Sequence, residues 1–70
     1  MHMEKFLTTR EREVFEMLVK SFDTVEIAKE LHISEKTVRN HISNVIQKLG
    51  VRGRSQAILE LIKIGEISLK

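Results

Sequence analysis

The sequence predicts an all-α domain of four helices, and three observations support this fold class. Residues 8–11 and 23–26 each fit a capping box, in which a Thr or Asp at a helix start and a Glu three positions later satisfy each other's backbone amides. Apolar residues recur at helical spacing over three turns between residues 38 and 49. The connections between these segments are short, and no stretch shows the alternating pattern of a strand.

The first two predicted helices follow closely on one another. The first begins at Thr8, with Leu7 packing just ahead of it, and ends at Ser21 and Phe22. The second begins after Asp23 and runs for about two turns. Its buried face is expected to consist of Ile27, Ala28 and Leu31.

A tight turn at residues 32–34 leads to the third predicted helix, residues 35–49. Ser34 is a favourable N-cap and Gly50 a natural C-cap. His32 stands where the turn usually adopts a left-handed conformation, so we interpret it as a turn residue rather than a ligand. The buried stripe of this helix is expected to contain Val38, Ile42, Val45, Ile46 and Leu49, with His41 at its edge.

The fourth predicted helix, residues 55–64, has apolar side chains on two sides. We assign Ala57, Ile58, Leu61 and Ile64 to the core. Leu59 and Ile62 lie on another side, and because a monomer does not need a second apolar stripe, we interpret them as the interface of a homodimer. The alternative is that all six belong to one broad core face.

Composition narrows the class of protein. The 70 residues make one domain, and the lack of Cys excludes disulfides and thiolate metal sites and fits a reducing cytoplasm. No apolar run is long enough to span a membrane. His2, His32 and His41 lack the spacing of metal ligands, and no catalytic arrangement or phosphate-binding loop is present, so we expect neither an enzyme nor a cofactor.

Positive charge is concentrated in the second half of the chain. Residues 1–35 carry five basic and eight acidic side chains, whereas residues 36–70 carry seven basic and two acidic ones. Five basic residues and no acidic one lie between Lys36 and Arg54. A stretch of one sign attracts a polyanion even when the net charge is only +2, although a solvated surface would have the same composition.

The exposed arc of the third predicted helix is rich in hydrogen-bond donors and lacks carboxylates. It contains Lys36, Asn40, Ser43, Asn44 and Gln47, flanked by Thr37 and Arg39. Arg and Lys pair with guanine and Asn with adenine in the major groove of DNA. A short helix, a tight turn and a longer polar helix also form the helix-turn-helix arrangement. The pattern therefore predicts double-stranded DNA as the partner, the alternative being a polar surface that lacks acidic residues by chance.

Several separated blocks of the chain resemble the LuxR-type helix-turn-helix family. In the order of the chain they are Leu7-Thr8-Thr9-Arg10-Glu11-Arg12-Glu13-Val14, Glu26-Ile27-Ala28, Ile33-Ser34, Thr37-Val38-Arg39-Asn40-His41-Ile42, Lys48-Leu49-Gly50-Val51 and Arg54-Ser55-Gln56-Ala57. The resemblance covers residues 6–67, and one departure is Ser21, where the family often has Gly. It implies a domain at residues 6–70 behind a short N-terminal tail, residues 1–5.

The resemblance also implies roles for individual residues. The third helix would enter the major groove, and the fourth would form a homodimer that binds an inverted repeat. Base-contacting positions fall on Arg39, Asn40 and Ser43, with Lys36 and Asn44 close by. Phosphate-contacting positions fall on Thr24, Val25, Thr37, Lys48 and Arg54. For Arg54, packing over the core or pairing with an acid is the alternative.

The family implies a transcription regulator that acts on the nucleoid in the cytoplasm. Residues 33–44 and 65–67 are most similar to family members that control spore development and consist of this domain alone, so we expect control of spore-coat genes, as activator or repressor, with RNA polymerase as a further partner. Two alternatives remain open. The chain could be the isolated output domain of a larger response regulator, or a helical module whose main partner is another protein.

Overall fold

The computed structural model describes residues 6–68, and within this range it contains four helices and no strand. They are α1 (Thr9–Val19), α2 (Thr24–Leu31), α3 (Glu35–Leu49) and α4 (Arg54–Lys63). The expected all-α class is therefore confirmed, while the predicted tail, residues 1–5, lies outside the described residues. No helix in this part of the chain is long and apolar enough to cross a membrane.

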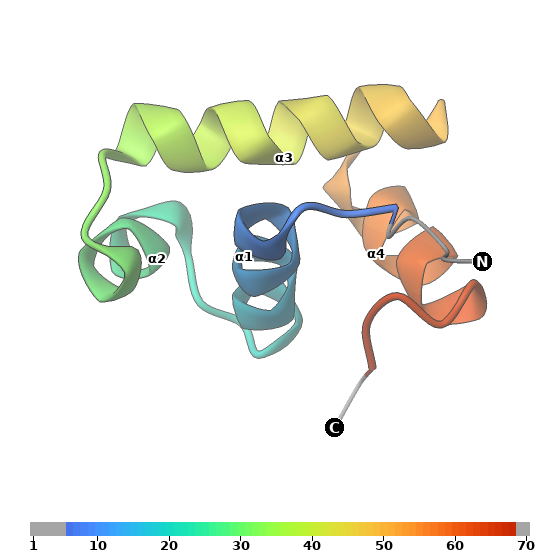
Figure 1. Cartoon of the computed structure of the whole chain (residues 1–70), viewed down its shortest axis with the longest axis horizontal. Coiled ribbons are helices and arrows are strands. Elements are labelled where there is room, and N and C mark those ends of the chain that lie inside the picture. The colour runs from blue at the N-terminus through green and yellow to red at the C-terminus, as the bar shows by residue number, and fades with distance from the viewer. Residues whose placement is uncertain (1–5, 69–70) are drawn as a thin grey trace, which may run out of the picture.

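Helix α3 is the shared element of the fold. It packs against α1, α2 and α4, and Figure 1 shows it lying across all three, with α1 between α2 and α4. Of the stripe that the helical period predicts, Val38, Ile42 and Val45 are buried, and Ile46 and Leu49 are half-buried against the core. The opposite arc of α3 consequently faces away from the other helices.

Side chains cap the first three helices. Thr8 Oγ1 accepts a hydrogen bond from the backbone amide of Glu11 at 3.1 Å, and Glu11 Oε1 accepts one from the backbone amide of Thr8 at 3.0 Å. Asp23 and Glu26 make the same reciprocal pair at 2.8 and 2.9 Å. Ser34 Oγ accepts an amide of the first turn of α3 at 3.0 Å. Both predicted capping boxes and the predicted cap of α3 are confirmed.

Two turn positions without glycine adopt the left-handed conformation. His32 ends α2 with φ 57° and ψ 44°, as its place in the turn predicts. Ser21, between α1 and α2, has φ 73°. A side chain at such an angle costs about 1 kcal/mol relative to Gly, which explains why Gly suits the position of Ser21.

Helix α4 differs from the expectation at both ends. It begins at Arg54, one residue early, and Gly53 in the N-cap position provides no side-chain hydrogen bond. It ends at Lys63, so Ile64, which was assigned to the core, is 53% exposed. That assignment is wrong because the helical period stops one residue before Ile64. The chain then turns at Gly65 and buries Ile67 instead.

The buried core contains ten apolar residues, from the segment just before α1 to the C-terminal turn. They are Leu7, Val14, Phe15, Ile27, Val38, Ile42, Val45, Ala57, Leu61 and Ile67. Arg12 of α1 holds the C-terminal turn in place, donating to the backbone carbonyl of Glu66 and, at 2.7 Å, to the carboxylate of the same residue. The turn after α4 therefore packs against α1 as part of the core.

Glu11 is the one charged residue of residues 6–68 that is fully buried, with 4% of its surface exposed. Its Oε1 accepts from the amide of Thr8 and, at 2.6 Å, from Lys48 Nζ of α3. The same ammonium donates to the Phe6 carbonyl at 3.2 Å and lies 5.5 Å from the centre of the Phe6 ring. One carboxylate thus caps α1 and connects it to α3.

The environment of Glu11 lowers the pKa of its carboxyl below the ordinary value of 4.5. Burial by itself raises the pKa, but the hydrogen bonds from Lys48 and from the Thr8 amide, together with the charge of Lys48, outweigh it. Because the pKa is lower in the folded protein, the ionised group stabilises the fold above the unfolded pKa. This stabilisation is lost as the pH falls through the folded pKa.

We therefore expect Glu11→Gln to lower the free energy of unfolding at pH 7 by about 1–3 kcal/mol, because Lys48 loses its charged acceptor. The difference from the wild type should shrink as the pH falls below about 4.5 and be smallest below the lowered pKa of Glu11 in the folded protein. Urea unfolding followed by circular dichroism between pH 7 and pH 3 measures both effects. The control is Glu16→Gln, an exposed carboxylate of α1. A difference from the wild type that stayed constant with pH would contradict the role of the ionised Glu11.

Candidate nucleic-acid interface

The outward arc of α3 carries exposed polar side chains, five of which were predicted to lie at or near the bases. They are Lys36, Arg39, Asn40, Ser43 and Asn44. The arc is positioned by the burial of Val38, Ile42 and Val45 on the opposite side of the helix. The structure brings together all the residues that were predicted to lie at or near the bases, and each offers hydrogen-bond donors to solvent.

The arc also contains a carboxylate, which was not predicted. Glu35, the first residue of α3, accepts a hydrogen bond from Arg39 Nη2 at 2.8 Å. The same oxygen, Oε2, accepts a hydrogen bond from the hydroxyl of Thr24 at 2.6 Å. The expectation of an arc without carboxylates is therefore incorrect at its N-terminal end. The spacing of four residues between Glu35 and Arg39 was the signal that could have identified the pair.

The first turn of α2 lies beside the start of α3, joined to it by the Thr24–Glu35 hydrogen bond. Thr24 is half-buried and Val25 is exposed. Asp23 accepts the amide of Glu26, and among the hydrogen bonds of residues 6–68 the amides of Thr24 and Val25 have no acceptor. Free amides at a helix start favour an anionic group such as a phosphate. The predicted phosphate contacts of these two residues are compatible with this geometry.

Two further predicted phosphate contacts have different surroundings. Thr37 is half-buried, and its hydroxyl lies 2.9 Å from that of Ser34 within the cap of α3. Arg54 is exposed at the start of α4, and no ion pair of the described residues involves it. Of the two alternatives for Arg54, pairing with an acid is therefore not observed in this part of the chain.

Lys48 has partners within the domain. Its ammonium is held by Glu11 at 2.6 Å and by the Phe6 carbonyl, and its side chain is 34% exposed. These two hydrogen bonds use two of the three donors of the ammonium, and the third remains available. Lys48 thus joins α3 to α1, and its phosphate contact stays a prediction.

The two residues assigned to the homodimer interface differ in exposure. Leu59 is 58% exposed, whereas Ile62 is half-buried and packs against the core. Ile62 therefore contributes to the core with part of its side chain, and its place in the homodimer interface stays a prediction. Exposure supports the interface assignment only for Leu59.

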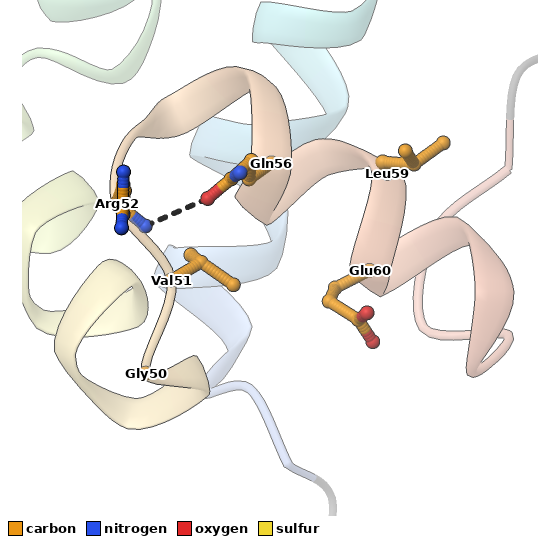
Figure 2. Close-up of a pocket in the computed structure, with 6 residues that line it drawn as sticks. All are labelled: Gly50, Val51, Arg52, Gln56, Leu59 and Glu60. Atoms are coloured by element: carbon orange, nitrogen blue, oxygen red, sulfur yellow. Dashed lines mark hydrogen bonds between the residues drawn. The ribbon is translucent and has the colours of Figure 1, made fainter.

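An open hollow of about 320 Å³ borders Leu59 on the α4 side of the domain. It is lined by Gly50, Val51, Arg52, Gln56, Leu59 and Glu60. Figure 2 shows Gln56 accepting the backbone amide of Arg52, at 2.9 Å, while the Leu59 side chain points away from this pair. The hydrogen bond joins the loop between α3 and α4 to the first turn of α4, and Leu59 is exposed one turn further on.

The histidines take no part in a metal site that the structure describes. His41 is half-buried at the edge of the core stripe of α3, as expected, and His32 is exposed in its turn. His2 lies outside the described residues. Among residues 6–68, no three His, Asp or Glu side chains are placed to hold a metal ion together.

Comparison with known proteins finds similarity to bacterial regulatory proteins. Residues 5–61 match the family model described as bacterial regulatory proteins, luxR family. Spore germination protein GerE of Bacillus subtilis (strain 168) is 70% identical over 63 residues, which cover 90% of this chain and 85% of that protein. Transcriptional regulatory protein DegU of Brevibacillus brevis is 44% identical over 64 residues, which cover 91% of this chain but only 27% of DegU.

A solved structure has the same fold. The structure described as transcription factor GerE matches 96% of this chain and 100% of its own, with a TM-score of 0.94 and 64% sequence identity. The agreement extends over α1 to α4, so the arrangement that presents the arc of α3 is common to both proteins.

Proposed function

Because this chain belongs to the LuxR family of bacterial regulatory proteins, we propose that it binds specific sites on double-stranded DNA as a homodimer with α3 in the major groove. The chain is a GerE homologue in a family of DNA-binding transcription regulators and not of enzymes, as the sequence indicates. The observation that carries the proposal is the exposed arc of α3, whose donors match the acceptors of base edges.

Each residue of the interface has a distinct role in this proposal. Arg39 donates to guanine, Asn40 forms paired hydrogen bonds with adenine, and the Ser43 hydroxyl contacts a base nearby. Lys36 and Asn44 extend the contact along the groove. The phosphates on either side are bound by the first turn of α2 (Thr24 and Val25), by Thr37, by Lys48 and by Arg54.

The proposed homodimer rests on Leu59. A large apolar side chain that is more than half exposed beside an open hollow gains from burial against a second copy. A two-fold axis near α4 would place the two α3 helices for two half-sites of an inverted repeat.

The proposed biological role follows the high identity to the spore germination protein GerE. We propose control of genes of sporulation, including those of the spore coat, by activation or repression on the nucleoid in the cytoplasm, with RNA polymerase as a further partner. The chain spans about a quarter of DegU, so the output domain of a larger regulator is the second candidate. A module that binds mainly another protein is the third.

Selection of bound duplexes from a random pool tests the proposal directly. We expect an enriched motif with inverted symmetry, because two copies of α3 would contact two half-sites. Affinity for the enriched duplex should fall about a thousandfold between 50 and 200 mM salt if the dimer neutralises about six phosphates. No enriched motif, or an affinity that did not change with salt, would favour the protein-binding module.

Arg39→Ala should reduce the preference for the enriched duplex over a shuffled one by about 1–3 kcal/mol, because one paired base contact is lost. Fluorescence anisotropy with both duplexes measures the ratio of affinities. The control is Lys20→Ala, which removes an exposed positive charge from the C-cap of α1. Equal ratios for Arg39→Ala and the wild type would show that α3 is oriented differently on DNA.

Leu59→Glu should yield a folded monomer that binds the full inverted repeat at least about tenfold more weakly, because two linked half-sites are no longer bound together. Sedimentation velocity and anisotropy measure the two effects. Ile64→Glu is the matched control, since Ile64 is similarly exposed on another side of the C-terminal part of the domain. If Leu59→Glu sedimented like the wild type, the result would contradict the proposed interface.

A further inference from the structure

We infer that Glu35 is a positioning residue that increases the DNA sequence discrimination of Arg39. This inference rests on the proposed function, since it assumes that Arg39 contacts a base. It starts from one carboxylate oxygen, Glu35 Oε2, which accepts hydrogen bonds from Arg39 Nη2 at 2.8 Å and from Thr24 Oγ1 at 2.6 Å.

The two hydrogen bonds join parts of the interface that have different tasks. Arg39 lies on the outward arc of α3, and Thr24 lies in the first turn of α2, where the amides are free for a phosphate. Thr24 is half-buried, and Glu35 is less exposed than Arg39, with side-chain exposures of 35% and 63%. The carboxylate is therefore held from the α2 side, and the guanidinium is the more exposed partner that it restrains.

Restraint of Arg39 favours binding to the correct base. A long exposed side chain loses rotamer freedom when it binds, and a side chain already held near its bound position loses less. The guanidinium has five N–H donors, and the contact with Glu35 uses one of them. The remaining donors suffice for a paired contact with guanine, so Glu35 can hold Arg39 while Arg39 binds the base.

The charge of Glu35 acts on DNA of any sequence. A carboxylate beside the phosphate-facing turn of α2 repels the DNA backbone, which weakens binding to every duplex. On the correct site the orientation of Arg39 compensates for this repulsion, and on other sites it does not. Glu35 thus widens the difference in affinity between correct and incorrect sites.

Glu35→Gln tests the inference, because it keeps the size of the side chain and removes the charge. We expect tighter binding to a shuffled duplex and a ratio of affinities, enriched over shuffled, that falls about fivefold. The control Glu16→Gln removes the same charge from an exposed position of α1 and should leave the ratio within twofold of the wild type. Circular dichroism establishes the temperature range in which each variant is folded.

Glu35→Asp separates the effect of side-chain length from the effect of charge. It keeps the negative charge but shortens the side chain, so it should weaken binding to the enriched duplex and leave binding to the shuffled duplex unchanged. It also carries the test if Glu35→Gln does not fold, because the inference then requires a reduced ratio for Glu35→Asp.

A double-mutant cycle with Arg39→Ala distinguishes positioning from a merely structural role. If Glu35 acts through Arg39, Glu35→Gln should lower the ratio in the wild-type background and leave it unchanged in the Arg39→Ala background. An unchanged ratio in the wild-type background, or an equal decrease in both backgrounds, would overturn the inference. A wild-type protein without any preference between the two duplexes would instead refute the proposed function, and the inference with it.

Discussion

The packing of α3 against all three other helices is the constraint on which the domain depends. A chain of 70 residues has few apolar side chains to bury, and here one stripe of α3 serves the interfaces with α1, α2 and α4 at once. The orientation of α3 about its own axis is consequently fixed by the core. The outward arc is determined just as firmly, although its side chains make few contacts of their own. In this domain the surface proposed to contact DNA is a direct product of core packing.

Two carboxylates connect α3 to other helices, one near each end of α3, and they differ in how deeply they are buried. Glu11 is buried, caps α1 and binds Lys48 near the C-terminal end of α3, so its removal would leave a cation without its partner. Glu35 is a third exposed and joins the N-terminal end of α3 to α2. The first interaction contributes to the stability of the fold. The second is exposed enough to rearrange when a ligand approaches.

The sequence was sufficient for features that depend on neighbouring residues. Thr8, Asp23 and Ser34 were identified as caps because their partners lie three positions away, and His32 was identified by its place in a turn. The features that the sequence did not predict depend on contacts distant in the chain. Lys48 pairs with a residue 37 positions earlier, and Ile67 fills the core in place of Ile64 because the chain turns after α4. A helical period indicates the faces of a helix, but it does not identify what lies opposite each face.

The missing cap of α4 links folding to assembly. The first three helices begin with a side chain that binds a backbone amide, whereas Gly53 provides no such group for α4. The start of α4 therefore depends on its packing more than the other helix starts do. A second copy that binds at Leu59 binds the folded form of this helix, so by mass action the midpoint of thermal unfolding would rise with protein concentration. The concentration of the regulator in the cell would then determine the fraction of it that is folded as well as the occupancy of its DNA sites.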